Sequence, residues 1–308
     1  MNTVEKPADK KSSDELSEII AEYDERLLPS RSLWADVVYN LYKNKIATIG
    51  LLVFMLICLA CLFAPFLTRW TFNEIHFEKF MLSPSREHIL GTDRLGRDVF
   101  TRLLYGGRTT LQITFVSTVL ATIVGTTIGL IVGYFGGWLD RLISGFIDTL
   151  ASIPLFILVL ACELALGWGE GNFMYAMAIA ATPGYVRLVR ASVMDIVRLE
   201  YIEASRALGL SHFQVITRHI LHNIAPKLMV RFTSGATEAL LLCSVMGYLG
   251  IGINPPRPEW GFLAYYGREF IRSRPSMLII PCIAIIVTAL SLNLFGDGLR
   301  DVLDNRES

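Results

Sequence analysis

The sequence predicts an all-α, polytopic membrane protein with six transmembrane helices. Of its 308 residues, 53% are hydrophobic and only 18% are charged, whereas soluble domains are about 45–50% apolar and about 25% charged. Several long stretches carry few or no charges, and about 20 apolar residues in a helix are enough to cross a bilayer. The 28 basic and 28 acidic residues balance, which argues against a nucleic-acid partner because phosphate binding requires a basic surface.

Six apolar stretches account for the six predicted helices. They are residues 46–64, 109–139, 142–166, 173–188, 228–253 and 277–296. At about 1.5 Å of rise per residue each can cross a bilayer, the fourth by continuing into its flank. Asp148, Pro154 and Glu163 interrupt the third stretch.

The polar start of the chain predicts a tail and a surface helix. We expect residues 1–30 to form a cytosolic tail, and we expect no cleavable signal peptide because no apolar stretch precedes the first span. The domain 31–108 is predicted to hold a helix lying on the membrane surface, the first span and an extracytoplasmic loop. Cys58 and Cys61 lie inside that span and are interpreted as packing residues rather than as a redox or metal pair.

The segment 69–108 contains a glycine pattern that suggests a phosphate loop. Gly91 and Gly96 have the required spacing, but Arg97 and Asp98 stand where lysine and serine or threonine are needed. No buried strand is expected before them. We therefore reject nucleotide binding at this segment.

The same segment predicts a short amphipathic helix. Thr92 or Asp93 would cap it, and Asp98 and Arg102 would form an ion pair one turn apart. Its lipid-facing residues would be Val99, Phe100, Leu103 and Leu104.

The loop 187–227 predicts two helices that meet at a glycine corner. Gly209 suits the left-handed residue that closes a helix, and Ser211 with Gln214 forms a capping box that opens the next one. Pro226 is expected to end the second helix. The two helices of residues 187–227 would form a projection outside the membrane, to which a partner protein can bind.

This projection resembles the EAA loop of ABC-importer permeases, whose pattern is Glu-Ala-Ala-x3-Gly-x9-Ile-x-Leu-Pro. The positions of this chain that correspond to the pattern are Glu203, Ala204, Ser205, Gly209, His219, Leu221 and His222. Ser205 replaces the second alanine, and His222 stands where the family usually has proline.

Four further stretches narrow the resemblance. Residues 91–98, 152–154, 248–261 and 293–304 are similar to the C-type permease subunit of the oligopeptide/dipeptide/nickel ABC importer family, a binding-protein-dependent transport system inner-membrane component. The matching motifs run from about residue 31 to residue 304.

The resemblance implies the type I ABC importer permease fold and a set of partners. A core permease domain, 109–300, would hold five transmembrane helices and the loop 187–227, and residues 301–308 would form a cytosolic C-terminus. The chain would pair with a sister permease subunit, two cytosolic ABC ATPase subunits and an extracytoplasmic solute-binding protein. It would itself be no enzyme and hold no cofactor, because the ATPase subunits bind ATP and magnesium.

The resemblance also implies roles for the residues of the projection. The EAA helix, with Glu203, Ala204 and Ser205, would dock in a groove of an ATPase subunit, and Gly209 would form the corner. His219 and Leu221 would lie on the second coupling helix, while residues 95–107 and 253–276 would face the binding protein. We predict no metal site at His219 and His222, because no carboxylate lies near them in the sequence.

Charges inside predicted spans are candidates for the translocation pathway, since each costs on the order of 3 kcal/mol in a membrane. Arg231 and Glu238 lie two turns apart on one helix face, and their separation of about 10.5 Å is expected to exclude a direct salt bridge. We hypothesise that this face lines the translocation cavity and that Glu238 meets a cationic group of the substrate, such as a peptide amine. The alternatives are a hydrogen bond between helices, or an Arg231 side chain that reaches the cytosolic edge of the membrane. Asp148 is expected to be structural, and Pro154 to kink its helix around the cavity.

These observations predict a permease subunit of an ATP-driven importer that moves peptides inward by alternating access. Nickel chelates or other small solutes are the alternative substrates. A self-sufficient secondary transporter is less favoured, because we find no inverted repeat between the halves. The expected location is the bacterial inner membrane, in contact with lipid, with both termini cytoplasmic.

Overall fold

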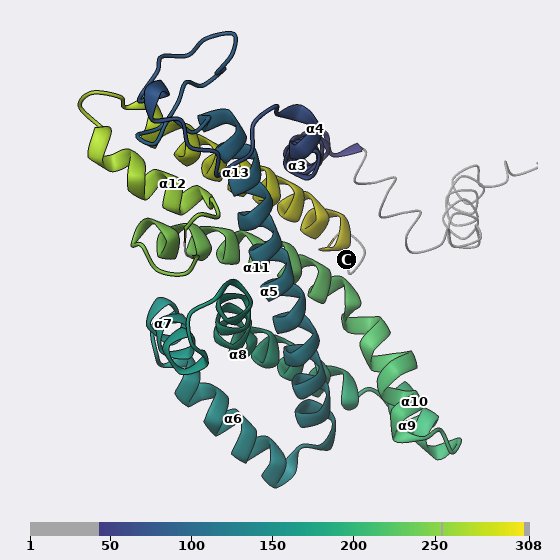
Figure 1. Ribbon diagram of the computed structural model, residues 1–308. Coiled ribbons are helices and arrows are strands. Elements are labelled where there is room, and N and C mark those ends of the chain that lie inside the picture. Colours follow the sequence, from purple (N-terminus) through teal and green to yellow (C-terminus); the bar gives the residue numbers. More distant parts are fainter. Residues whose placement is uncertain (1–42, 254, 305–308) are drawn as a thin grey trace, which may run out of the picture.

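The computed structural model describes residues 43–253 and 255–304, which form helices joined by loops (Figure 1). No β-strand forms among these residues, so the all-α prediction is confirmed for them. The predicted tail 1–30, the predicted surface helix from residue 31 and residues 305–308 lie outside the described residues.

Long helices make up most of the described chain. In order they are α3 (Lys45–Leu62), α4 (Ala64–Leu67), η1 (Phe77–Lys79), α5 (Val99–Phe135), α6 (Gly137–Ala151), α7 (Leu155–Leu166), α8 (Glu170–Val197), α9 (Glu200–Ala207), α10 (His212–Gln214), η2 (Val215–Ile220), α11 (Leu221–Tyr248), α12 (Trp260–Gly267), η3 (Arg268–Phe270) and α13 (Ser276–Asp304). Of the segments marked η, η2 is a π-helix and the others are 3-10 turns.

Among the described residues, four helical stretches are long and apolar enough to cross a membrane: α3, α5, His212–Tyr248 and Ser276–Leu303. α6 and α7 together form a fifth candidate that is bent by 100°. The fourth predicted span lies in α8, which is not among these candidates and carries Arg187, Arg190 and Asp195 in its second half. The count of six spans therefore stays a prediction.

α5 begins at Val99 rather than at residue 109. Asp98 caps it, because its carboxylate accepts hydrogen bonds from the Thr101 backbone N–H at 2.7 Å and from the Thr101 hydroxyl at 2.8 Å. The predicted short helix is thus the start of α5, and its cap is Asp98 rather than Thr92 or Asp93.

One side of this first stretch of α5 is covered by protein rather than lipid. Leu104, which was expected to face lipid, is buried. Cys61 of α3 and Trp260 of α12 close on Gly107 in the same part of α5. Packing by these two helices explains why the amphipathic prediction is wrong at Leu104.

The predicted ion pair between Asp98 and Arg102 does not form. Asp98 Oδ1 lies 2.9 Å from His88 Nδ1, and both side chains are buried. The Arg102 guanidinium donates to the Phe72 carbonyl at 3.0 Å and lies 3.7 Å from the Asp93 carboxylate. Asp98 precedes the helix, so its side chain turns toward the first-turn N–H groups and away from Arg102.

The predicted third span is broken into two helices. α6 ends at Ala151, α7 begins at Leu155, and their axes differ by 100°. Pro154 has no N–H with which to continue the hydrogen bonds of α6, and a proline disfavours the helical conformation at the residue before it. The kink expected at Pro154 is confirmed, and it amounts to a complete break.

α5 and α8 make the most extensive contact between helices in the described chain. Three glycines at four-residue intervals on α5 meet three larger side chains at the same interval on α8. The pairs are Gly125 with Tyr185, Gly129 with Val189, and Gly133 with Val193. A Cβ atom on Gly129 would lie 2.7 Å from Val189 Cβ, so only glycine allows the two helices to approach this closely.

Pro226 does not end the second coupling helix, so that prediction is wrong. α11 contains Pro226 in its second turn, and the π-helix η2 leads directly into it. A proline there removes one backbone hydrogen bond, while the neighbouring Ile220 and Ile224 are buried in a core shared with α5 and α8. The projection therefore continues without interruption into the predicted fifth span.

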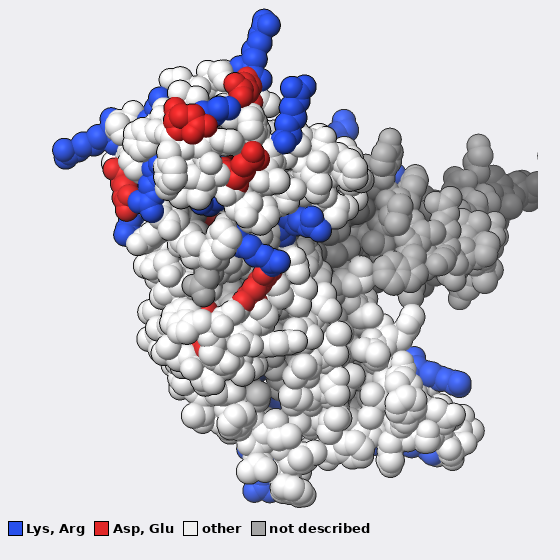
Figure 2. All heavy atoms as spheres, viewed as in Figure 1, with Lys and Arg blue, Asp and Glu red and all other residues white. Residues whose placement is uncertain are grey.

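The two ends of the bundle carry different elements. Figure 1 shows α9 and α10 at one end, and α12 with the segment that precedes α5 at the other. Figure 2 shows charged side chains gathered at this second end, next to a broad face with few charges. A surface that faces lipid must carry few charges, because charged side chains in the hydrocarbon are energetically costly.

Glu259 fixes α12 between α5 and α11. Its carboxylate accepts hydrogen bonds from the N–H groups of Gly261 and Phe262, each at 2.8 Å, and from the Thr110 hydroxyl at 3.1 Å. It also fills the space beside Gly247 of α11. Burial raises the pKa of Glu259 to about 7, although these three donors oppose the shift.

The contact of α5 with α8 predicts the effect of a larger side chain. Gly129→Leu should destabilise the detergent-solubilised protein by at least about 2 kcal/mol, because the new side chain overlaps Val189. Gly145→Leu on α6 is the matched control, since a Cβ atom at that position would have nothing within 4 Å of it. The control should change stability by no more than about 0.5 kcal/mol. Equal thermal unfolding temperatures for the two variants would contradict the close packing.

The buried Glu259 predicts a dependence of stability on pH. Folding raises the pKa of this carboxyl from 4.5 to about 7, so its contribution is complete below pH 4.5 and is lost as the pH rises through about 7. Relative to Glu259→Gln, the wild-type protein should lose up to about 3 kcal/mol between about pH 5 and about pH 8. The unfolding temperature of the wild-type protein minus that of Glu259→Gln should therefore fall as the pH rises. A value that stays constant or rises with pH would contradict this account.

Candidate functional site

A cavity of about 410 Å³ opens between α5, α8, α11 and the break between α6 and α7. Its volume lies within the range of small-molecule sites. Most of its wall is apolar, and its lining residues include Pro154, Tyr185, Arg187, Arg231, Gly235 and Glu238. The cavity thus contains three of the four predicted pathway residues.

Arg231 and Glu238 form a bidentate salt bridge in this cavity. Arg231 Nη1 lies 2.8 Å from Glu238 Oε1, and Nη2 lies 3.1 Å from Oε2. The prediction that their spacing excludes a direct contact is wrong, because it counted the helix rise and left out the length of the side chains. Glutamate side chains on a helix lean toward its N-terminus, and the two side chains together are long enough to meet across two helical turns.

Arg231 is held more firmly than its partner. Its guanidinium carbon lies 5.1 Å from the centre of the Tyr185 ring, and Gly184 of α8 lies beside its Nη2 atom. The Arg231 side chain is 24% exposed and the Glu238 side chain 55%. α8 therefore fixes the arginine, while the carboxylate faces the open cavity.

Asp148 lies on α6, and Pro154 lies at the break between α6 and α7. Asp148 binds Arg187 of α8 at 2.7 and 3.0 Å and does not itself line the cavity, whereas Arg187 does. Pro154 lines the wall at the break before α7. The expected structural role of Asp148 fits this tether between α6 and α8.

The projection has the predicted local geometry. α9 ends in a turn where Gly209 adopts a φ of +85°, a conformation that favours glycine. Ser211 and Gln214 form the predicted capping box, with the Gln214 N–H donating to Ser211 Oγ at 3.3 Å and the Ser211 N–H donating to Gln214 Oε1 at 2.9 Å. The glycine corner and the second helix start are confirmed.

The predicted coupling residues are not all available to a partner. Glu203, Ala204 and Gly209 are exposed, but Ser205 is buried and donates to the Tyr201 carbonyl at 2.7 Å. The side chains of His219 and Leu221, on the second helix, are half-buried. Ser205 thus points into the protein and supports the projection from within.

Two apolar side chains at the tip were missed by the sequence reasoning. Leu208 is 81% exposed and Phe213 is 74% exposed, although large apolar side chains are usually buried. Both flank the Gly209 corner, and that position is the signal that could have identified them. An exposed apolar pair on a projection is typical of a protein–protein contact.

The projection is attached rigidly to α5. The hydroxyl oxygen of Tyr134 on α5 lies 2.8 Å from His212 Nδ1. The Arg206 guanidinium lies 4.8 Å from the centre of the Tyr134 ring. Below these contacts, Ile202 and Val215 are fully buried in a core that includes residues of α5 and α8. A movement of the projection therefore moves these helices.

His219 packs against the projection itself. Its ring centroid lies 6.3 Å from that of Tyr201. Within the described part of the chain, no group of three histidine, cysteine, aspartate or glutamate side chains is placed to hold a metal ion.

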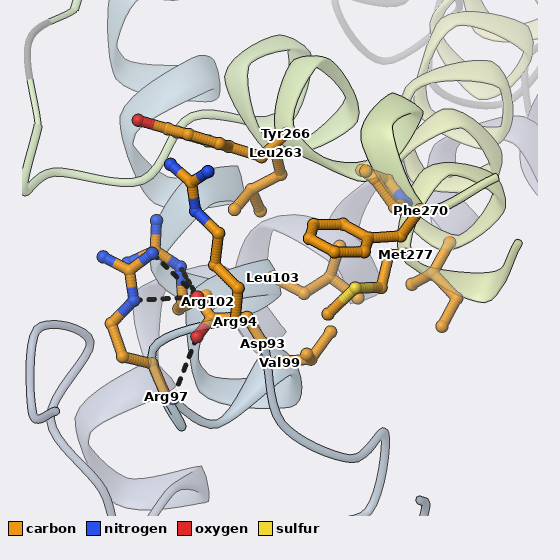
Figure 3. A pocket seen from close by; sticks show the side chains of 13 residues that line it. Asp93, Arg94, Arg97, Val99, Arg102, Leu103, Leu263, Tyr266, Phe270 and Met277 are labelled. Atoms are coloured by element: carbon orange, nitrogen blue, oxygen red, sulfur yellow. Dashed lines mark hydrogen bonds and ion pairs between the residues drawn. The ribbon is translucent and has the colours of Figure 1, made fainter. Parts of the chain in front are cut away.

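At the opposite end, Arg97 and Arg102 lie beside the Asp93 carboxylate, and Arg94 lines the same pocket (Figure 3). Arg97 donates to Asp93 at 2.8 Å, Arg102 lies nearby, and Arg94 stacks on the Tyr266 ring at 4.5 Å. The pocket they line measures about 50 Å³, which suits a few water molecules rather than a solute. This cluster joins the segment before α5 to α12.

Comparison with known proteins identifies related chains over nearly the whole length. A dipeptide transport system permease protein of Alkalihalophilus pseudofirmus is 40% identical over 89% of this chain and 90% of its own. A probable D,D-dipeptide transport system permease protein of Escherichia coli is 34% identical over 88% and 91%. A glutathione transport system permease protein of Pectobacterium atrosepticum is 35% identical over 89% and 91%.

The fold also has a counterpart among solved structures. An inward-facing methionine ABC transporter superposes with a TM-score of 0.54 at 22% identity, covering 65% of this chain and 96% of that one. The N-terminal transmembrane domain of oligopeptide transport permease C matches residues 32–84, and the inner membrane component of binding-protein-dependent transport systems matches residues 125–308. The chain belongs to the family of inner membrane components of binding-protein-dependent transport systems.

Proposed function

We propose that this chain is the permease subunit of an ATP-driven importer that carries short peptides inward. The names of its relatives support the substrate class, since they include dipeptide and di/tripeptide transport permeases. In this proposal the chain pairs with a sister permease, and two ATPase subunits and a binding protein complete the importer. The ATP and magnesium belong to the ATPase subunits.

One observation carries the proposal. The continuous helical stretch His212–Tyr248 holds the tip residue Phe213 at one end and Glu238 of the cavity further along. These two residues are roughly 37 Å apart along the helix. A push on the projection therefore reaches the cavity through one element.

The coupling residues follow from this arrangement. Glu203, Ala204 and Gly209 would form the exposed surface that meets an ATPase subunit, with Leu208 and Phe213 as its apolar centre. Ser205, His219 and Leu221 would support that surface from within and from the second helix. When the ATPases close on ATP, the projection would move as a rigid body and change the access of the cavity.

The pathway residues have separate roles in the same proposal. Arg231, Glu238 and Pro154 would line the route of the solute, while Asp148 would hold Arg187 at its edge. Alternating access then requires α6 and α7, which meet at Pro154, to move relative to α11.

The proposed orientation follows from the projection, which must face the cytosolic ATPases. Both termini would then be cytoplasmic in the bacterial inner membrane, and residues 1–30 would form a cytosolic tail. The segments 95–107 and 253–276 would face the binding protein on the opposite side.

The exposed tip predicts the binding of the ATPase. Leu208→Ser combined with Phe213→Ser should reduce the ATPase recovered with the tagged chain by at least about tenfold, because central apolar contacts dominate such interfaces. Phe80→Ser with Ile89→Ser is the matched control, since these side chains are 59% and 58% exposed at the other end. Undiminished ATPase recovery with the tip variant would contradict the proposal.

The glycine corner predicts a second effect. Gly209→Val places a β-branched residue at a φ of +85°, which costs at least about 1–2 kcal/mol and distorts the turn. ATPase recovery should fall with this variant. Gly167→Val also places a β-branched residue at a positive φ, +87°, between α7 and α8, and it should leave ATPase recovery unchanged. Similar losses in both variants would mean that general strain, not the corner, is responsible.

A further inference from the structure

The Arg231–Glu238 pair contributes little that stability alone would require. Both residues lie on α11, so the bridge joins no two helices, and it is open to the cavity. Partly exposed pairs of this kind stabilise proteins by about 0–1 kcal/mol. Placing two charges on the wall of a membrane cavity therefore needs another explanation.

The charges of the cavity wall cancel. Its charged lining residues are Arg187, which is bound by Asp148, and the pair Arg231 and Glu238. A solute with a net charge would enter this cavity without a compensating charge. A solute with one positive and one negative end could instead exchange partners with the pair.

Both members of the pair retain capacity for a ligand. A guanidinium has five N–H donors and a carboxylate accepts about four hydrogen bonds, whereas the bridge between them uses two. Arg231 stays in place on the Tyr185 ring. Glu238, with 55% of its side chain exposed, is free to turn away from it.

We propose that Arg231 and Glu238 bind the two charged ends of a zwitterionic peptide, Arg231 taking the carboxylate and Glu238 the ammonium group. This inference rests on the proposed function, and it narrows the substrate to short peptides with free ends. An extended dipeptide spans about 7 Å, so Glu238 swings out while Arg231 remains on α8. In the empty cavity the two residues neutralise each other.

The exchange removes an energetic obstacle to transport. Charged ends that leave water or a binding protein lose their partners, and unpaired charges are strongly disfavoured in a membrane. Opening one ion pair and forming two with the peptide compensates for this loss. Without the pair, peptide entry becomes slow even when the binding protein is saturated.

The test compares uptake of radiolabelled alanyl-alanine by the complete importer in proteoliposomes, with saturating binding protein and ATP inside. Uptake is expressed per assembled complex. R231Q/E238Q removes both charges but leaves two amides that can hydrogen-bond to each other. It should lower the uptake rate by at least about tenfold, the effect of losing hydrogen bonds to charged groups.

Two variants serve as controls. R231K/E238D keeps both charges but loses the guanidinium fork that lies on the Tyr185 ring, so its uptake should fall between that of the wild type and that of R231Q/E238Q. D140N/R190Q removes a comparable Arg–carboxylate pair between α6 and α8, outside the cavity lining, and should retain uptake.

Each outcome decides a different point. Full uptake by R231Q/E238Q beside an active wild-type importer would overturn this inference alone, since a pair that only neutralises itself can be replaced by two amides. Loss of uptake in D140N/R190Q to the same extent would overturn it as well. Absence of ATP-driven alanyl-alanine uptake by the wild-type importer would overturn the proposed substrate class and this inference with it.

Discussion

Close packing of α5 on α8 is the constraint on which the rest of the described structure depends. Glycines on α5 admit Tyr185 and Val189 of α8 at distances that any side chain would prevent. Tyr185 in turn supports the Arg231 guanidinium, and both helices form walls of the cavity. At the other end of this contact, Val193 lies in the core that holds the projection. One helix pair thus places both candidate functional regions.

α11 provides the second connection between these regions. It follows the projection through the π-helix η2, and its residues Arg231 and Glu238 line the cavity. π-helical segments are rare and often occur at functional sites, and η2 lies between the tip of the projection and the cavity residues of α11. At the far end Glu259 ties α12 to α5, which gives the bundle a fixed end against which the other can move.

Local signals made much of the fold predictable from the sequence. The long uncharged stretches identified the main helices, the Gly209 corner and the Ser211 capping box depend on neighbouring residues only, and Pro154 marked the break. Features that depend on side-chain reach or on distant packing were missed. The salt bridge between Arg231 and Glu238 is the clearest case, because the helix rise alone does not describe two long side chains that lie along one helix face.

Other errors have related causes. The start of α5 was placed too late because Asp98, its cap, was assigned to an ion pair. Ser205 was assigned to the docking surface, although its hydroxyl turns inward to the Tyr201 carbonyl. Leu208 and Phe213 were missed because large apolar residues are ordinarily buried, and only the folded corner shows that nothing in the described chain covers them.

The most direct test of the account asks whether transport depends on ATP and on the ATPase subunits. Proteoliposomes holding this chain and the proposed sister permease, with and without the proposed ATPase subunits, would be loaded with ATP or left empty, and entry of a labelled dipeptide presented by a binding protein would be followed. The account predicts uptake against a gradient only when the ATPases and ATP are both present. Equal uptake by vesicles that lack the ATPases would contradict it and would indicate a self-sufficient transporter.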